Sequence, residues 1–518
     1  MAFLSNAQVR FLVVVMVLFA ALAATAPAEA ARRPPVVVIA FDEFPVDSLL
    51  RPDARIDSVR YPGFARLARM ATWFPNVISA HDQTPHALPA ILDGQSPGPG
   101  SRPIPSDHPR NLYTLLASRG YRVRSIEPFS NVCPTPICPH ALMGGPGPHP
   151  FFLSKRVARF RATLRSIRPT PDPLLIFHHQ LLPHGPWTYL PSGRAHRREA
   201  RPWDLGVSSE LGFHDVFLTH QNQQRHLLQV GFVDFEIVQL LDRLERVGLL
   251  KRALLVVTAD HGISFDVGAT DRRQVSRTNI DEVAPVPLFI KAPGQRRGRI
   301  DRAYVRTVDV LPTIADLLNL GPLWPMDGRS VFHRRGPQMV RMPSRDLSRW
   351  VSLTPSMLER ARAANRREKA RLFGIGSESL FRIGPHPGLI GRSLADVVVE
   401  PGEAKISGFT PTVDFYPSSE HAPIWFTGGV TSKQTSARRD LAIAVNGQVA
   451  AVGRTFRLRG SVTERFSLLV PEAVLRPGPN QAALFEVRRD RLLRLGPAEA
   501  HVEPAVDGGP RGGVHDAP

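Results

Sequence analysis

Four almost wholly apolar runs of consecutive residues stand out in the N-terminal part of the chain. They lie at 36–41, 174–177, 254–258 and 286–290. Runs of this length without polar alternation are typical of parallel strands buried on both faces. Helical patterns at 111–119 and 226–246 lie between them, each followed by a glycine that suits a helix end. This alternation predicts an α/β fold with a largely parallel central sheet flanked by helices.

The pattern changes after about residue 335. An Ala/Arg/Glu-rich stretch at 356–371 favours a helix, and Gly and Pro then become frequent. Short alternating stretches follow at 442–445, 448–452, 466–470 and 482–487, the first two joined by Asn446-Gly447. Short strands with such turns predict a small C-terminal antiparallel β module.

The chain is therefore expected to divide into five segments. These are a signal peptide or N-terminal membrane anchor (1–30), a main α/β domain (31–335), a helical or irregular extension (336–400), the β module (401–503) and a disordered Gly/Pro-rich tail (504–518).

The N-terminus bears on the compartment. Arg10 precedes an apolar run at 11–26, and the small-x-small pattern at 28–30 suits a signal peptidase. We expect an exported protein, periplasmic or extracellular, or one anchored to the membrane by an uncleaved N-terminal segment. In such an oxidising compartment the only two cysteines, Cys133 and Cys138, are expected to form a small disulfide loop.

Charge narrows the class of partner. The chain has 65 Lys and Arg against 46 Asp and Glu, which gives a net charge of +19. A basic protein of this kind favours anionic surroundings, here an anionic envelope lipid or polymer and association with a membrane. The sequence contains no zinc-finger spacing or aromatic RNA-binding motif, so nucleic acid is not an expected partner.

Polar residues follow two of the predicted strands. Asp42-Glu43 ends the first strand, and Asp260-His261 follows the strand at 254–258. The carboxyl ends of parallel strands meet at one edge of a sheet. An Asp-His-Gly sequence alone also fits a turn in which Asp caps a helix. A second acidic pair at the same edge favours a cation, because buried carboxylates are unfavourable unless they are paired or bound to metal.

A nucleophile candidate lies at 84. Pro85 suits the first turn of a helix, so Thr84 is expected at a helix N-terminus, where backbone N–H groups favour an anion. The alternative is an ordinary threonine N-cap.

Five segments together resemble the alkaline-phosphatase/sulfatase superfamily over residues 36–331. They are Asp42 with its strand, the 73–77 lead-in with the Thr84-to-Gly94 segment, the Asp260-His261-Gly262 turn, the strand at 286–294 and the helix start at 308–313. The resemblance implies an alkaline-phosphatase-like fold and a sulfatase-like catalytic domain at 31–335. Sulfatases carry Cys or Ser as nucleophile and an Arg four residues later, where this chain has Thr84 and Leu88. That departure is closest to lipoteichoic-acid synthases and phosphoethanolamine transferases.

The resemblance also implies a ligand set. It makes Asp42, Thr84, Asp260 and His261 ligands of one divalent metal ion, Mn, Zn, Mg or Ca, with Glu43 as an additional candidate. Residues 306–309 lack the histidine expected of two-metal members, which favours a single ion.

A second catalytic residue is implied in the 182–187 segment. His184 there resembles the histidine that holds the transferred group, and the alternative is a loop histidine packed against Trp187. His178 and His179 are expected to be structural, and the sequence does not decide whether His81 and His86 touch substrate.

The implied function is a metal-dependent hydrolase or transferase of phosphoesters that forms a covalent phospho-threonine at Thr84. Two alternatives stay open: a sulfuric-ester hydrolase, and a non-catalytic envelope-binding protein that retains the fold.

Overall fold

A computed structural model describes residues 33–139, 155–196, 213–321, 323–333, 339–432, 438–458, 462–489 and 491–497. The predicted N-terminal signal or anchor at 1–30 and the predicted tail at 504–518 lie outside the described residues. None of the described helices is both long and apolar enough to cross a membrane.

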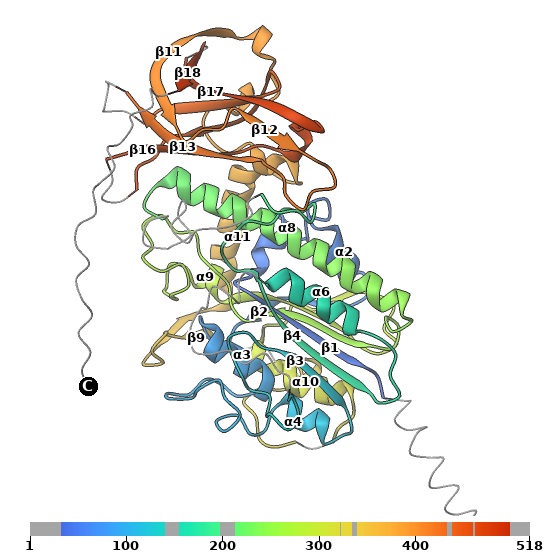
Figure 1. Ribbon diagram of the computed structural model, residues 1–518. Helices are drawn as coiled ribbons and strands as arrows, with labels where there is room; N and C mark the ends of the chain where they lie inside the picture. Colours follow the sequence, from blue (N-terminus) through green and yellow to red (C-terminus); the bar gives the residue numbers. More distant parts are fainter. Residues whose placement is uncertain are drawn as a thin grey trace, which may run out of the picture.

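An eight-stranded sheet forms the centre of the larger part (Figure 1). Its order is β3 (Arg122–Ile126), β4 (Leu174–Pro183), β1 (Val36–Asp42), β5 (Leu254–Ala259), β6 (Pro285–Lys291), β2 (Thr72–Ile78) and β7 (Arg299–Ile300), with β8 (Val305–Arg306) also paired to β2. Only β6 runs antiparallel to its neighbours. The predicted largely parallel sheet is confirmed, and all four apolar runs are strands within it.

Helices cover both faces of this sheet. In Figure 1 α2 (Pro62–Ala68), α6 (Arg156–Ser166) and α8 (Val216–Arg246) lie on one side. On the other side lie α3 (Thr84–Asp93), α4 (Leu112–Ala117) and α10 (Val310–Leu317). The continuous core includes every apolar residue of β1 and β5, which explains why these strands show no polar alternation.

The helix predicted at 226–246 begins ten residues earlier, at Val216. Its N-terminal half contains the polar run 221–225, which hides the amphipathic pattern. That half is nevertheless buried, because the C-terminal sheet packs on it: Phe217, Leu227 and Leu228 belong to the same core cluster as Ile443 of that sheet. Tertiary contacts, which the local pattern does not report, therefore extend this helix.

The C-terminal part is a second eight-stranded sheet. Its order is β15 (Gln448–Arg454), β14 (Asp440–Val445), β17 (Gly478–Arg488), β18 (Arg491–Pro497), β11 (Val398–Ser407), β13 (Trp425–Thr431) and β16 (Glu464–Leu469), with β12 (Thr412–Phe415) paired to β17. All pairs are antiparallel except β11 with β18. The predicted antiparallel module is confirmed in character, and β11, β12, β13 and β18 are additions to the predicted strands.

A hairpin and a helix lie between the two sheets along the chain. A hairpin of β9 (Val340–Pro343) and β10 (Trp350–Leu353) precedes α11 (Pro355–Phe373), and α9 (Ile280–Val283) packs against α11. The remaining short elements are 3-10 helices: η1 (Val46–Leu49), η2 (Thr307–Asp309), η3 (Val331–His333), η4 (Glu378–Phe381), η5 (Pro387–Leu389), η6 (Leu394–Asp396) and η7 (Glu472–Val474).

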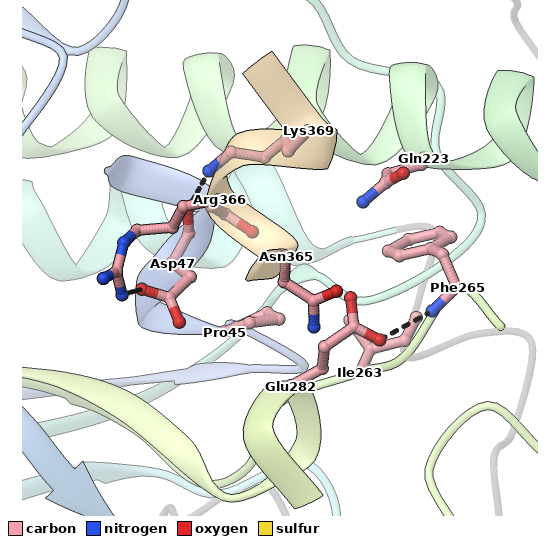
Figure 2. Close-up of a pocket in the computed structure, with 10 residues that line it drawn as sticks. Pro45, Asp47, Gln223, Ile263, Phe265, Glu282, Asn365, Arg366 and Lys369 are labelled. Carbon is pink, nitrogen blue, oxygen red and sulfur yellow. Dashed lines mark hydrogen bonds and ion pairs between the residues drawn. The ribbon is translucent and has the colours of Figure 1, made fainter. Parts of the chain in front are cut away.

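The basic face of α11 is fixed by one buried carboxylate. Arg362 Nε donates to Asp47 Oδ2 at 2.8 Å, Arg366 Nη1 donates to Asp47 Oδ1 at 3.1 Å, and Lys369 Nζ donates to the Asp47 carbonyl. Burial alone would raise the pKa of Asp47, but these cations lower it. Figure 2 shows Asp47, Arg366 and Lys369 at a small pocket between η1, α8 and α11, with about 30 Å³ of space, enough for a water molecule and too small for a substrate.

The two cysteines confirm their predicted pairing. Cys133 and Cys138 are joined by a disulfide, and both are buried at the edge of the main core. The 133–138 loop thus packs against the α/β part rather than standing free in solvent.

A buried carboxyl group links α8 to β4. Gln180 Nε2 donates to both carboxylate oxygens of Glu236, at 2.7 and 2.8 Å. Burial raises the pKa of Glu236 to about 8, although the Gln180 hydrogen bond and the charge of Arg156 lower it. Glu236 is therefore expected to hold a proton in the folded protein at pH values where it is ionised in the unfolded chain.

We expect Glu236→Gln to change how stability depends on pH. A carboxyl pKa raised by folding stabilises the fold below its unfolded pKa of about 4.3, and that contribution is lost as the pH rises towards the folded pKa. Because glutamine does not titrate, the variant should gain about 3–4 kcal/mol over wild type between about pH 5 and about pH 8. Urea unfolding of both proteins at about pH 5 and about pH 8 measures their free energies of unfolding. If variant and wild type differ by the same amount at both pH values, the prediction is wrong.

Candidate active site

The candidate site forms where β1 and β5 end side by side. Phe41 and Ala259 are partners in the parallel register, and the Asp260 N–H donates to the Phe41 carbonyl at 2.9 Å. The next residues on each strand, Asp42 and Asp260, therefore project from the same edge of the sheet. This is the juxtaposition that the two apolar runs predict.

Three side chains converge at this edge. Asp42, Asp260 and His261 each offer a ligand atom, and these atoms all lie within 4.8 Å of one another. All three residues are buried, Asp42 with 1% of its surface exposed. The mixture of carboxylate oxygens and one imidazole nitrogen suits Mn or Zn better than Mg or Ca, which prefer oxygen ligands.

Asp42 provides the test of whether a cation fits. Neither of its carboxylate oxygens has a hydrogen-bond partner among the described residues. Burial first, and then the charges of Asp260 and Glu43, raise its pKa well above the ordinary range. Within the described part of the chain no Lys or Arg forms an ion pair with Asp42 or Asp260. Two buried carboxylates without a basic partner are what one divalent cation would balance.

The histidine is oriented by its own turn. His261 Nδ1 lies 3.0 Å from the Gly262 carbonyl, so Nδ1 carries the proton and donates. Nε2 is left with its lone pair, 3.9 Å from Asp42 Oδ1 and 3.6 Å from Asp260 Oδ2. This is the tautomer that a metal-binding histidine requires.

Gly262 is required by close packing. A Cβ at this position would lie 2.2 Å from the Glu282 carbonyl oxygen, and the Gly262 N–H donates to the Val283 carbonyl at 2.8 Å. A side chain here would push the chain away from α9 and move His261 with it.

Thr84 faces the same three residues. It is the first residue of α3, as Pro85 predicts, and only 7% of it is exposed. Its Oγ1 donates to Asp260 Oδ2 at 2.7 Å and lies 3.5 Å from His261 Nε2. The hydroxyl is thus next to the candidate ligands and at the N-terminal end of a helix.

The structure places Glu43 against arginine rather than within the triad. Arg272 Nη2 donates to Glu43 Oε1 at 2.7 Å, and Arg273 Nε lies 3.6 Å from the same oxygen. Burial would raise the pKa of Glu43, but Arg272 and the other cations around it lower it. Glu43 has a positive φ of 58°, which turns its side chain away from that of Asp42.

His184 lies beside Glu43. Its Nε2 is 3.5 Å from Glu43 Oε1, and its Nδ1 is 2.6 Å from the Gly185 carbonyl. Burial lowers the pKa of His184 to about 4, although Glu43 raises it, so the ring is neutral near neutral pH. None of its hydrogen bonds or ion pairs among the described residues reaches Thr84.

His179, which was expected to be structural, lies next to the triad. β4 continues to Pro183, and His179 lies beside Ala40 of β1. Its Nε2 is 3.5 Å from Asp260 Oδ2, and neither ring nitrogen has a hydrogen-bond partner among the described residues. The signal was a histidine two residues after the apolar run 174–177, on the strand that pairs with β1. His178, in contrast, faces α6 and contacts Thr163 at 2.6 Å, as expected of a structural residue.

Comparison with known proteins identifies the family. Residues 147–320 match the family model described as Sulfatase. This third of the chain is thus similar to the sulfatase family. This confirms the superfamily suggested by the five sequence segments. The matched stretch includes His184, Asp260 and His261, whereas Asp42 and Thr84 precede it.

Individual relatives are distant. An endo-4-O-sulfatase of Bacteroides thetaiotaomicron is 24% identical over 187 residues, which is 34% of this chain and 35% of that protein. N-sulphoglucosamine sulphohydrolase of Homo sapiens is 28% identical over 114 residues, 21% of each chain. The chain thus spans about a third or less of these curated relatives. Among solved structures, a phosphonate monoester hydrolase of Agrobacterium radiobacter aligns with a TM-score of 0.45 and 16% identity, over 64% of this chain and 83% of that one.

Proposed function

We propose that the protein is a metal-dependent hydrolase or transferase of phosphate esters, with Thr84 as the nucleophile. The observation that carries this proposal is the position of the Thr84 hydroxyl, 2.7 Å from Asp260 Oδ2 beside the Asp42, Asp260 and His261 triad. Ordinary N-cap threonines bind backbone N–H groups of their own helix. This hydroxyl instead faces three buried groups that suit a cation.

The triad and helix α3 would together bind the cation and the ester. A divalent cation held by Asp42, Asp260 and His261 would lower the pKa of a neighbouring hydroxyl and neutralise charge on the ester oxygens. Helix α3 begins at Thr84, so the positive end of its dipole lies beside the triad and would favour an anion there.

The proposed reaction has two displacements. The Thr84 Oγ1–phosphorus bond forms as the bond to the leaving oxygen breaks; the hydroxyl, oriented by its hydrogen bond to Asp260, loses its proton to solvent. Water then supplies a proton to the leaving oxygen, and His184, which is neutral near neutral pH, would bind the phosphoryl oxygens. Water, or an acceptor alcohol in a transferase, attacks the phospho-threonine and restores the Thr84 hydroxyl.

Substrate class is tested by comparing two chromogenic esters. We expect purified protein with Mn²⁺ to hydrolyse bis-p-nitrophenyl phosphate at least about a hundredfold faster than p-nitrophenyl sulfate. The physical reason is that a threonine alkoxide adds directly to phosphorus and the resulting phosphothreonine can be displaced by water. The sulfatase names of the relatives favour the second candidate, sulfate ester hydrolysis. Faster release from the sulfate ester would support that alternative and reject ours.

The proposal also includes the compartment of the protein and the kind of substrate. The net charge of +19 and the apolar run at 11–26 support export and an anionic envelope lipid or polymer as substrate. One relative carries the name extracellular sulfatase, which is consistent with an exported protein. Fractionation of cells expressing the full chain, with mass spectrometry of the mature N-terminus, tests both export and cleavage after Ala30.

A further inference from the structure

The β9–β10 hairpin reaches the wall of the candidate site. The turn between its strands contains Arg345, whose Nη1 forms an ion pair with Asp271. The Arg345 Nε lies 3.8 Å from Asp82 Oδ1, and Asp82 is only two residues before Thr84. A residue about 260 positions further along the chain thus lies beside the segment that carries the nucleophile.

Two nitrogens of the Arg345 guanidinium have no hydrogen-bond partner in the described part of the chain. They are Nε and Nη2, and both are buried. The 3.8 Å to Asp82 exceeds hydrogen-bond length, and Asp82 Oδ1 is itself buried without a partner. The Arg345 side chain is 26% exposed, but these two nitrogens are inaccessible, and buried donors normally have an acceptor.

A second arginine lies between the hairpin and the triad. Arg273 Nε is also buried without a hydrogen-bond partner among the described residues, 3.6 Å from Glu43 Oε1. Burial lowers the pKa of Arg273, but the carboxylates of Glu43, Asp271, Asp42 and Asp82 together raise it. Arg273 is therefore close to both Asp42 of the triad and Asp82 at the hairpin.

These donors suit one chemical class. Guanidinium groups present N–H donors in a planar fork that matches the oxygens of a phosphate or similar tetrahedral oxyanion. Both side chains already pair with carboxylates, Arg345 with Asp271 and Arg273 with Glu43, so their unpartnered N–H groups, rather than their net charge, favour such a ligand. Asp82, which lies beside Arg345, is two residues before Thr84.

We propose that Arg345 of the β9–β10 hairpin, with Arg273 beside it, binds the oxygens of the substrate's phosphoryl or related tetrahedral oxyanion group. The hairpin, which lies outside the matched sulfatase-family stretch, is then part of the substrate site. This inference rests on the proposed function and assigns it a specificity-determining residue.

Direct binding of inorganic phosphate tests the proposal without any turnover. Isothermal titration would use the full chain in excess Mn²⁺. We expect Arg345→Ala to weaken phosphate binding about tenfold or more, and Arg345→Lys to recover part of the loss. Two matched variants serve as controls. Asp271→Asn breaks the ion pair but keeps the arginine, so phosphate affinity should stay within about threefold. Arg349→Ala removes an exposed arginine from the same turn and should not change it.

Each outcome decides the question. Weaker phosphate binding in Arg345→Ala, with nearly unchanged binding in Asp271→Asn and Arg349→Ala, supports a binding role for Arg345. Equal losses in Arg345→Ala and Asp271→Asn would mean that Arg345 only anchors the hairpin, and would overturn the inference. So would wild-type affinity in Arg345→Ala, or no phosphate binding by the wild-type protein. Hydrolysis of bis-p-nitrophenyl phosphate, measured on the same samples, reports separately on the proposed function, because it can persist when the Arg345 assignment fails.

Discussion

Replacing Thr84 by alanine should reduce turnover of bis-p-nitrophenyl phosphate by at least about a thousandfold, while the protein stays folded. The hydroxyl is the only group of Thr84 that contacts Asp260 and His261, and the remaining methyl group cannot attack phosphorus. The Thr84→Ser variant keeps the hydroxyl and should retain activity within about tenfold, since it loses only a methyl group at a buried helix start.

The same experiment can locate the covalent intermediate. Wild-type protein quenched in acid during turnover should carry phosphate on the peptide that contains Thr84, and Thr84→Ala should carry none. Phosphate on another residue would contradict the assignment, as would full activity in Thr84→Ala.

Asp42→Asn is expected to affect stability in opposite directions with and without metal. In metal-free protein the wild-type side chain is a buried carboxyl without a hydrogen-bond partner among the described residues, and its pKa is raised by burial and by Asp260 and Glu43. A raised folded-state pKa means that stability is lost as the pH rises above the unfolded value of about 3.9. Asparagine removes that loss, so the metal-free variant should be more stable than wild type by about 1–3 kcal/mol at about pH 8.

With Mn²⁺ the order should reverse. The wild-type unfolding temperature should rise on adding metal, whereas that of Asp42→Asn should hardly move, because a ligand with full charge has been lost. Differential scanning calorimetry with and without Mn²⁺ measures both effects. Asp53→Asn is the matched control, since Asp53 is a partly exposed carboxylate that pairs with Arg51 and should respond to metal as wild type does. Equal stabilisation of Asp42→Asn and wild type by metal would place the cation elsewhere.

Much of the site could be predicted because its signals are local. Asp42 and Asp260 each follow an apolar run, and parallel strands align their carboxyl ends, so two patterns suffice to bring the side chains together. Thr84 was predictable because Pro85 marks the first helical turn. None of these inferences needed knowledge of how distant segments pack.

The remaining parts depend on such packing. The start of α8 was missed because its polar run is buried only by the C-terminal sheet. His179 was expected to be structural, and its position beside Asp260 was not predicted, because the apolar run that marks β4 stops at Phe177. Arg345 carries no local signal, since one arginine among many in a basic chain becomes informative only when its neighbours are known.

The long helix α8 also has a mechanical consequence. Its N-terminal half forms part of the C-terminal core, where Gln221 Nε2 donates to the Ser467 carbonyl at 2.6 Å. Further along, His226 Nε2 lies 3.2 Å from the Glu43 carbonyl, directly after Asp42. The single helix α8 thus connects the C-terminal sheet to the backbone next to Asp42, a candidate metal ligand. A displacement of the C-terminal sheet would therefore be transmitted along α8 to the end of β1 at Asp42.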